Sequence, residues 1–385
     1  MQSRLAAMLV TRNFPPLQGG MERLNQQLLI SMSAKWRMVL CGPSGASKHV
    51  PDNVKVHESS VKPLWWFMLR TLCLSVFKAR KTNPALIIAG SGLTAPLVYL
   101  AAKLSGSRSV VYLHGLDLVV ANKIYQLFWL PMIRRCNHVL VNSKNTAALA
   151  IERGVQENRI HLLSPGTDIP MLDASLIDDF RANNGLGKAR ILLAVGRLTA
   201  RKGLAEFVAN CLPELVSAYP DLMLVIIGGE ATDALNAGKR SEKNRIQQAA
   251  DNAGVGHNIV FLGRCDDLAL AAAYQAAEMH VFPVQDLPGD VEGFGMVAIE
   301  AAAHGLSTIA FATGGVSEAV ANGLSGELIA PGDYRQFSKA VLARLKAGRS
   351  DSELTSCRTF AEANSWDNFA RKLDTLCAGF IGADK

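Results

Sequence analysis

Short apolar runs alternate with longer mixed segments along most of the chain. Apolar runs bounded by Gly, Pro, Asn or Asp are typical of buried strands, and apolar residues three or four positions apart are typical of helices. Strands that alternate with helices indicate an α/β fold with doubly wound parallel sheets. We predict strands at residues 5–10, 38–41, 54–57, 85–89, 109–113, 138–141, 159–163, 191–195, 222–227, 259–262, 279–283, 308–312 and 326–329. We predict helices at residues 24–32, 64–77, 95–104, 125–136, 146–153, 268–277 and 337–346, and three more that start near 204, 296 and 366.

The pattern stops and restarts near the middle of the chain, which indicates two domains. A length of 385 residues is also too great for one ordinary hydrophobic core. A polar stretch from Asp173 to Lys188 separates the two series of strands. We therefore predict one domain over residues 1–168, a second over 169–365 and a C-terminal segment over 366–385.

Composition and charge narrow the class of protein. Hydrophobic residues make up 49% and charged residues 19%, which is a globular composition. Residues 1–167 hold 20 Lys and Arg against 6 Asp and Glu, whereas residues 168–385 hold 20 against 27. A basic half beside an acidic half indicates two surfaces with different partners. The basic half has no nucleic-acid-binding motif, so an anionic membrane surface or a pyrophosphate-bearing lipid is the better candidate partner.

Cysteine usage and the start of the chain bear on location. Seven cysteines, an odd number, and the lack of any Cys-x-x-Cys pair argue against a disulfide framework and against a zinc ribbon. We expect reduced, mostly buried thiols in a cytoplasmic protein. The first ten residues carry one early Arg and a short apolar run, which fits a strand and not a secretory signal.

Residues 64–77 form an unusual apolar segment that contains Trp65 and Trp66 and ends in a basic stretch at 78–81. These 14 residues are too few to span a bilayer, which needs roughly 20. The aromatic pair and the basic end suit a helix that lies in a membrane interface. A helix that packs in the core and carries lysines in its last turn fits the same residues, so both interpretations stay open.

Two cations follow the first strand of the second half. The strand at 191–195 runs into Gly196 and Arg197, and Lys202 comes just before the next helix. Such an arrangement suits an anion, because Arg can hold phosphate oxygens with two hydrogen bonds and Lys supplies a compact charge. A basic turn on the surface is the alternative.

A second polar motif follows the strand at 279–283. Glu292 and Glu300 bracket a Gly-Phe-Gly turn that leads into an alanine-rich helix. One acid lies just before the helix and the other about one turn inside it, so both can face the same ligand. The free N–H groups and the positive dipole end at this helix start suit a phosphate.

Together these segments resemble the donor site of the retaining glycosyltransferases of family 4, which have the GT-B fold. The family signature of Glu, seven residues and Glu is matched by Glu292 and Glu300, and Gly-Arg-x-x-x-x-Lys-Gly matches its diphosphate-binding motif. Gly19-Gly20 and the His-Gly-x-Asp run from His114 match motifs of its first domain. The resemblance covers nearly the whole chain. It implies two Rossmann-like domains that face a central cleft, with the last helix crossing back onto the first domain.

The resemblance also implies roles for the matched residues. Arg197 and Lys202 would stabilise the leaving diphosphate. Glu300 would accept hydrogen bonds from the ribose, and Glu292 would hold the sugar. The implied catalytic residues are His114, Arg197, Lys202 and Glu292. The implied substrate-binding residues are Gly19, Gly20, Gly196, Gly229, Glu230, Gly263, Arg264, Gly293, Phe294, Gly295, Met296, Val297 and Glu300.

The implied function is retaining hexosyl transfer from a nucleotide-diphosphate sugar to a lipid-linked or cell-surface glycan, without a metal or another cofactor. The Asp-Val-Glu-Gly-Phe-Gly sequence resembles mannosyltransferases that use GDP-mannose, while a UDP-hexose stays open. We expect a cytoplasmic protein, peripheral on the inner face of the cytoplasmic membrane, with no nucleic-acid partner. Two alternatives remain: a sugar-nucleotide epimerase or hydrolase of the same fold, and a non-catalytic sugar-nucleotide-binding protein.

Overall fold

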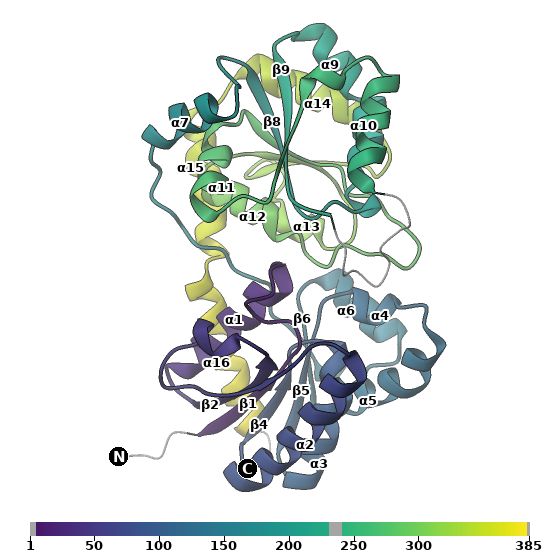
Figure 1. The fold of residues 1–385 in the computed structure, drawn as a ribbon, viewed down its shortest axis with the longest axis vertical. Helices are drawn as coiled ribbons and strands as arrows, with labels where there is room; N and C mark the ends of the chain where they lie inside the picture. Colours follow the sequence, from purple (N-terminus) through teal and green to yellow (C-terminus); the bar gives the residue numbers. More distant parts are fainter. Residues whose placement is uncertain (1–4, 231–240, 383–385) are drawn as a thin grey trace. The chain divides into compact units, whose positions relative to one another are not determined.

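A computed structural model of the chain describes residues 5–230 and 241–382 (Figure 1). The chain divides into two compact units. Unit 1 comprises residues up to Gly166, the segment Gly289–Phe294 and the C-terminal segment from Trp366. Unit 2 comprises Thr167–Pro288 and Gly295–Ser365. Residues 1–4 and 383–385, at the outer ends of the predicted domains, lie outside the described part.

Within the described residues, unit 1 is built on a seven-stranded parallel sheet with the order β3-β2-β1-β4-β5-β6-β7. The order reverses at β1, which pairs with β2 on one side and with β4 on the other, so that Ala7 of β1 lies opposite both Met38 of β2 and Leu86 of β4. All five residues of β1 are buried, so this strand is the centre of the unit. The strands are β1 (Ala6–Val10), β2 (Arg37–Pro43), β3 (Lys55–Ser59), β4 (Leu86–Ala89), β5 (Arg108–Leu113), β6 (His138–Val141) and β7 (Ile160–Leu162).

Helices pack on this sheet, and α2 and α3 lie side by side (Figure 1). The last helix, α16, packs against α1, where Lys35 and Asp374 form an ion pair. Its Phe380 stacks on His138 with 3.9 Å between the ring centroids. The chain therefore ends as part of unit 1. The helices are α1 (Gly20–Ser33), α2 (Leu64–Thr82), α3 (Ala95–Ser105), α4 (Leu116–Val119), α5 (Leu130–Arg135), α6 (Lys144–Glu152) and α16 (Trp366–Gly382), with short turns η1 (Ala46–His49), η2 (Gly92–Thr94), η3 (Tyr125–Trp129) and η4 (Glu157–Arg159).

The described part of unit 2 contains a six-stranded parallel sheet with the order β10-β9-β8-β11-β12-β13, which reverses between β8 and β11. The strands are β8 (Arg190–Val195), β9 (Leu222–Ile227), β10 (Ile259–Gly263), β11 (Met279–Phe282), β12 (Thr308–Phe311) and β13 (Gly326–Ile329). The helices are α7 (Ser175–Asn183), α8 (Leu204–Asn210), α9 (Leu212–Ala218), α10 (Glu242–Asn252), α11 (Asp267–Ala276), α12 (Met296–Ala303), α13 (Val316–Ala319), α14 (Tyr334–Ala347) and α15 (Asp351–Ala363), with the short turns η5 (Ala200–Lys202) and η6 (Gly256–Asn258).

The core of unit 2 lies on both faces of its sheet. Leu192 and Ala194 of β8 belong to one hydrophobic cluster, whereas Ile191 and Leu193 belong to a second cluster. Successive side chains of a strand point to opposite faces, so both faces of β8 are apolar. This is the arrangement of a parallel sheet covered by helices on both sides, and it explains why the strands appear in the sequence as continuous apolar runs.

Three expectations about elements are wrong. The stretch from Asp173 to Lys188 is not a plain linker, because it contains α7, whose Phe180 is buried in the core of unit 2. Helices α10 and α15 were not predicted. Residues 125–136 do not form one regular helix, since a π-helical turn precedes α5. Pro131 has no N–H group to donate to the carbonyl of Leu127, which interrupts the regular helical hydrogen bonds there.

Candidate functional site

The carboxyl ends of β8 and β11 lie side by side where the strand order of unit 2 reverses. Open parallel sheets bind ligands at such a point. Gly196 follows β8, and the turn η5 brings Lys202 back to the same edge. The Lys202 amine lies 4.5 Å from the centroid of the Phe282 ring, and a Cβ at Gly196 would lie 3.3 Å from Lys202 Cε. Unit 2 thus brings Gly196 and Lys202 together. Arg197 follows Gly196 in the chain, and its side chain is exposed.

A neutral imidazole, that of His280, lies within β11, one of the two strands whose carboxyl ends meet here. His280 of β11 is fully buried, and its Nδ1 lies 3.1 Å from Thr308 Oγ1. Burial, together with the positive charge of Lys202, lowers the pKa of His280 to about 3. The imidazole is therefore uncharged at neutral pH, and it adds no positive charge to that of Lys202.

Glycine backbone forms the adjoining part of the edge, at the ends of β9 and β10. Gly228 donates its N–H to the carbonyl of Gly263 at 2.7 Å. The side chain of Arg264 passes over Gly229, because a Cβ at Gly229 would lie 3.0 Å from Arg264 Nε. Unit 2 therefore brings Gly229, Gly263 and Arg264 together, as expected for a surface on which a nucleoside could lie.

Glu230 is engaged by a helix. Its carboxylate accepts hydrogen bonds from Ser241 Oγ at 2.6 Å and from the backbone N–H of Lys243 at 2.9 Å, at the N-terminus of α10. Burial raises the pKa of Glu230, but these hydrogen bonds outweigh it and hold the pKa below its usual value. An acid at a helix N-terminus stabilises that helix, so Glu230 has a structural partner besides the predicted ligand.

The start of α12 depends on a glycine. Gly295 has a φ of 97°, in the left-handed region, and a Cβ there would lie 2.9 Å from Phe282 Cε1. Only glycine adopts this conformation without strain so close to a ring. Met296 and Val297, half-buried, form the first turn, and their N–H groups are not used by the helix itself.

Glu300 lies one turn inside α12, as predicted, and a tyrosine from α11 reaches it. The hydroxyl of Tyr274 lies 3.4 Å from Glu300 Oε2 and 3.3 Å from the carbonyl of Val297. The ring of Tyr274 stacks on His304, whose Nδ1 lies 2.8 Å from the Glu300 carbonyl. Sequence reasoning missed Tyr274, although it is the only aromatic residue in the alanine-rich run of α11.

In unit 1, the segment Gly289–Phe294 packs on the turn after β5. A Cβ at Gly293 would overlap the carbonyl oxygen of His114 and would lie 2.8 Å from Asn142 Nδ2. No side chain fits at this position. Phe294 is buried and Glu292 is half-buried. Unit 1 therefore brings Gly293 to the His114 turn, and Glu292 and Phe294 are its neighbours in the chain, while Glu300 belongs to unit 2.

His114 is buried at the end of β5, and its Nε2 lies 2.9 Å from the carbonyl oxygen of Gly90. A carbonyl only accepts, so Nε2 carries a proton, and in the neutral imidazole Nδ1 is left as an acceptor. The backbone N–H of His114 donates to Asp117 Oδ2 at 3.0 Å. Burial raises the pKa of Asp117, and the charge of His114 and the N–H donors of His114 and Gly92 oppose that rise. Asp117, which completes the predicted His-Gly-x-Asp run, thus holds the turn.

Gly19 and Gly20 lie at the start of α1, which begins four residues earlier than predicted. Glu22 is in its first turn, and Glu22 Oε1 accepts a hydrogen bond from Asn13 Nδ2 at 2.8 Å. A Cβ at Gly19 would overlap Glu22 Oε2. An acid stabilises a helix N-terminus. The Glu22 carboxylate therefore stands beside the glycines that the family resemblance assigns to the diphosphate.

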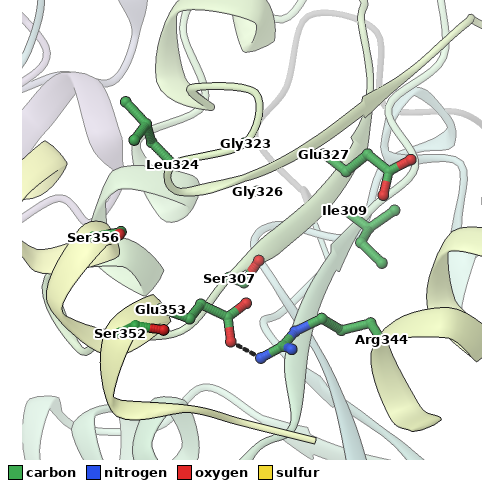
Figure 2. Close-up of a pocket in the computed structure, with 10 residues that line it drawn as sticks. All are labelled: Ser307, Ile309, Gly323, Leu324, Gly326, Glu327, Arg344, Ser352, Glu353 and Ser356. Carbon is green, nitrogen blue, oxygen red and sulfur yellow. Dashed lines mark ion pairs between the residues drawn. The ribbon is translucent and has the colours of Figure 1, made fainter. Parts of the chain in front are cut away.

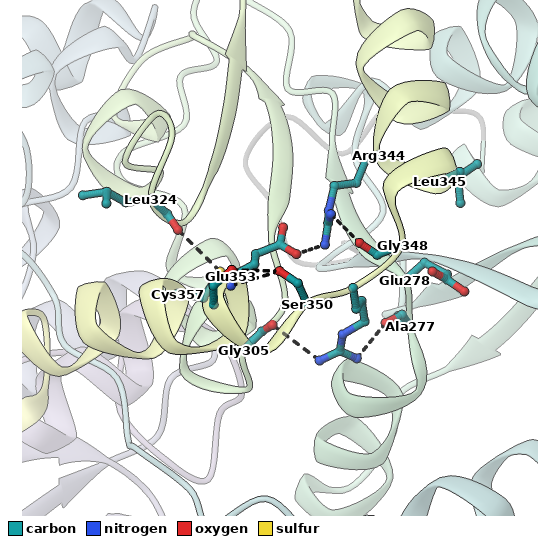
Figure 3. Close-up of polar contacts among 12 residues, drawn as sticks. Ala277, Glu278, Gly305, Leu324, Arg344, Leu345, Gly348, Ser350, Glu353 and Cys357 are labelled. Carbon is teal, nitrogen blue, oxygen red and sulfur yellow. Dashed lines mark hydrogen bonds and ion pairs between the residues drawn. The ribbon is translucent and has the colours of Figure 1, made fainter.

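A cavity lies elsewhere in unit 2. It measures about 310 Å³ and is lined by residues at the amino ends of β12 and β13, including Ser307 and Gly326 (Figure 2). Arg344 and Glu353 form an ion pair in its wall. Arg344 also donates to the carbonyl of Gly348 at 2.7 Å, which holds the C-terminal end of α14, while its ion pair with Glu353 links α14 to α15 (Figure 3). None of the predicted site residues lines this cavity. Ligands of parallel sheets bind at the carboxyl ends of the strands, whereas this cavity lies at the amino ends. We therefore place the candidate site at the carboxyl ends of β8 and β11.

Residues 5–230 and 241–382 contain no group of three or more His, Cys, Asp or Glu side chains that could hold a metal ion. All seven cysteines are free, and five of them are buried, as expected from their number and spacing.

Two family models match the chain in succession. The model described as Glycosyltransferase Family 4 matches residues 18–169, and the model described as Glycosyl transferases group 1 matches residues 177–364. Nearly all of the first match lies in unit 1, and most of the second match lies in unit 2.

Curated relatives carry glycosyltransferase names. The chain is 29% identical over 265 residues to the D-inositol 3-phosphate glycosyltransferase of Geodermatophilus obscurus. The aligned region covers 66% of this chain and 54% of that protein. It is 25% identical over 354 residues to the GDP-mannose-dependent alpha-(1-6)-phosphatidylinositol monomannoside mannosyltransferase of Mycolicibacterium smegmatis, which covers 87% of each. The chain thus spans about half the length of the inositol-phosphate relatives that it matches.

Solved structures show the same fold. HepE of Anabaena in complex with UDP-glucose has a TM-score of 0.79 at 18% identity, over 97% of this chain and 99% of that one. Sucrose-phosphate synthase of Thermosynechococcus elongatus has a TM-score of 0.77 at 21% identity, over 99% and 100%. With two Rossmann-like units and both family models matched in order, the chain belongs to the family 4 and group 1 glycosyltransferases of the GT-B fold.

Proposed function

We propose that the protein transfers a hexose, mannose in the first instance, from a nucleotide-diphosphate sugar to a lipid-linked or cell-surface glycan. The observation that carries the proposal is the position of Lys202 against Gly196 and Phe282, at the reversal point between β8 and β11. A cation beside glycine backbone at this edge suits a diphosphate.

The chemistry follows from where charge develops. When the bond between the anomeric carbon and the phosphate oxygen breaks, negative charge grows on the leaving diphosphate. Lys202, Arg197 and the N–H groups at the start of α12 stabilise that charge, and one such donor contributes roughly 3 kcal/mol in enzymes where it has been removed. Glu300, contacted by Tyr274, accepts hydrogen bonds from the ribose hydroxyls. The glycine backbone near Arg264 carries the base.

We further propose that the anomeric configuration is retained and that no metal takes part. The acceptor hydroxyl attacks the anomeric carbon on the face that the diphosphate leaves, and its proton passes to the leaving phosphate oxygen. The new glycosidic bond forms as the old one breaks, so the step balances without a covalent intermediate on a carboxylate. Proton NMR of the product would report the configuration, and activity that survives a chelator would support the absence of a metal; inversion, or loss of activity restored by a divalent cation, would contradict these two points.

The names of the relatives guide the choice of substrates. The relative from Mycolicibacterium smegmatis is named for GDP-mannose, which supports mannose, whereas HepE was solved with UDP-glucose. Inositol appears in the names of both kinds of relative. Inositol-containing acceptors, such as phosphatidylinositol, are therefore the first acceptors to test.

A thermal-shift screen tests the donor, since a ligand that binds only the folded protein raises its melting temperature. We expect GDP-mannose to raise the melting temperature more than UDP-glucose or UDP-N-acetylglucosamine does. A larger shift with a UDP-sugar would replace mannose in the proposal. Incubation with the donor alone separates transfer from the epimerase and hydrolase alternatives, because those reactions consume the donor without an acceptor. Binding without any turnover would favour a non-catalytic protein.

A further inference from the structure

Helix α2 of unit 1 turns large apolar side chains away from the protein. Trp65, Leu69, Cys73 and Phe77 follow one another at intervals of four residues, so they form one stripe along the helix. Trp65 is 66% exposed, Leu69 51% and Phe77 62%, and Cys73 is exposed as well. Single exposed apolar residues are ordinary on a protein surface, but a continuous stripe of them marks an interaction site.

The rest of α2 packs on the core of unit 1, where Met68, Leu72 and Val76 are partly buried. The buried residues of α2 are Phe67, Thr71, Ser75 and Ala79, and the Ser75 hydroxyl donates to the carbonyl of Thr71 within the helix. A surface helix normally buries its large apolar residues and exposes its polar ones. Three of the four buried positions here are small, which allows α2 to pack close to its neighbours, including α3. Packing inside unit 1 therefore does not explain the outward stripe.

The surroundings of the stripe are basic. Residues 59–151, which include α2, α3 and α5, contain 11 Lys and Arg and a single acid, Asp117, which is half-buried. The helix itself contains Arg70, Lys78, Arg80 and Lys81 and no acid. Acids do occur on α1 and α16 of the same unit, so the excess of positive charge belongs to the α2 part of the unit.

A second apolar group lies on the segment that leads into α5. Ile124, Leu127 and Phe128 are all exposed, and Lys123 precedes them. Helix α3 contacts both α2 and α5, so the two apolar groups belong to neighbouring helices of one layer.

We propose that the outward stripe of α2 docks on an anionic lipid bilayer, with the helix lying in the interface and Trp65 at the level of the headgroups. Tryptophan prefers this level, and basic residues beside an apolar stripe are attracted by anionic lipids. A second copy of the chain suits the surface less, because a two-fold contact through α2 would place its cations against themselves. In the described parts of the chain, no helix has the length and apolar character to cross a membrane. The inference does not depend on the identity of the donor.

Flotation of the full-length protein with vesicles tests the inference. Vesicles of phosphatidylcholine alone are compared with vesicles that also contain phosphatidylglycerol. We expect binding to the mixed vesicles that weakens as salt is added, and binding at least roughly tenfold weaker to phosphatidylcholine alone. The variant Trp65→Glu/Phe77→Glu removes the stripe, and Arg80→Glu/Lys81→Glu reverses the charge. Leu268→Glu is the matched control, because Leu268 is 67% exposed on α11 of unit 2.

Each outcome bears on the inference. Loss of vesicle binding in both double variants, with Leu268→Glu unchanged and all melting temperatures near that of the original protein, supports docking through α2. Failure of the unaltered protein to float with mixed vesicles overturns it. A concentration-dependent dimer in sedimentation that Trp65→Glu/Phe77→Glu abolishes, without vesicle binding, would identify the stripe as a self-association surface and also overturns it. Binding that survives both double variants would overturn the role of α2 as well.

Discussion

The two units share one sheet topology at their reversal points but fill those points with different groups. In unit 2, the edge between β8 and β11 carries Lys202 next to glycine backbone. In unit 1, the edge between β1 and β4 is closed by neutral side chains. Asn25 Nδ2 donates to the carbonyls of Asn13 at 2.9 Å and Gly90 at 3.1 Å, and Thr94 Oγ1 donates to Val10 O at 2.9 Å. The same topology thus carries a cation beside glycine backbone in one unit and a closed hydrogen-bonded network in the other.

The fold alone therefore does not decide where a charged donor binds. The reversal point of a parallel sheet is a place for a ligand, but the side chains set which ligand it can hold. We infer that unit 2 holds the diphosphate and the nucleoside. Unit 1 contains His114, whose ring is held by Gly90 and whose turn is held by Asp117. Substitutions in the two units should therefore change different kinetic quantities.

The largest effect is expected from Lys202→Ala. Loss of the cation beside Gly196 should lower kcat/KM by roughly 100-fold or more, since charge on the leaving group is stabilised mainly in the transition state. Steady-state kinetics with the donor found by thermal shift measures this. Lys188→Ala, an exposed lysine between α7 and β8, is the control and should change little. A loss below about tenfold for Lys202→Ala would remove Lys202 from this role.

Glu300→Gln should have a smaller effect, and it should act on binding of the donor, because Glu300 belongs to unit 2. A hydrogen bond to a charged acceptor contributes about 1.5–3 kcal/mol, so the KM for the donor should rise by roughly tenfold or more, with a smaller change in kcat. Glu327→Gln, at the exposed opposite edge of the same sheet, is the matched control. If kcat fell while the KM for the donor stayed constant, binding of the ribose by Glu300 would be wrong.

Gly293→Ala tests how tightly the segment Gly289–Phe294 packs on the His114 turn in unit 1. The added methyl group would overlap the His114 carbonyl, so the segment must shift, at a cost on the order of 1–3 kcal/mol. Thermal denaturation should show a lower melting temperature. Gly379→Ala in α16 has open space around it and should raise the melting temperature slightly, because alanine favours a helix. Equal melting temperatures for Gly293→Ala and the original protein would mean that Gly293 is not tightly packed on the turn.

At neutral pH the smallest effect is expected at His280, because its titration changes stability only as the pH falls. The pKa of His280 is lowered to about 3 in the folded protein from an ordinary value of 6.5. The unfolded chain therefore binds the proton first, and the stability that this residue contributes is present above pH 6.5 and decreases as pH falls toward 3. Denaturant unfolding at several pH values should show this slope, and His280→Gln should flatten it. An unchanged slope in the variant would show that other groups cause the acid sensitivity.

Much of the fold could be predicted, for a physical reason. Strands covered on both faces need apolar side chains at every position, so β9 has the same bounds in the structure as in the prediction. The bounds of β6 and β13 were also predicted, although these strands contain His138 and Glu327. Helix starts were harder. Helix α1 begins at Gly20 without a side-chain cap, so no Ser, Thr or Asp marked its start. Helix α7 was missed because its nine residues are mostly polar.

The site could be predicted only in part. The residues that follow strands, such as Gly196 and Lys202, are local in the sequence, and the alternation of strands and helices determines which edge they reach. The contacts between distant residues could not be predicted. Tyr274 and Glu300 are 26 positions apart, and the packing of Gly293 on His114 joins segments that are much farther apart. Such contacts depend on tertiary packing, which periodicity does not encode.

Titration calorimetry with a nucleoside diphosphate shows which unit binds the diphosphate. We predict that Lys202→Ala weakens binding of the diphosphate by roughly tenfold or more, whereas His114→Gln leaves its affinity within about twofold of the original protein. The opposite result, in which His114→Gln abolishes binding and Lys202→Ala does not affect it, would contradict the placement of the diphosphate in unit 2.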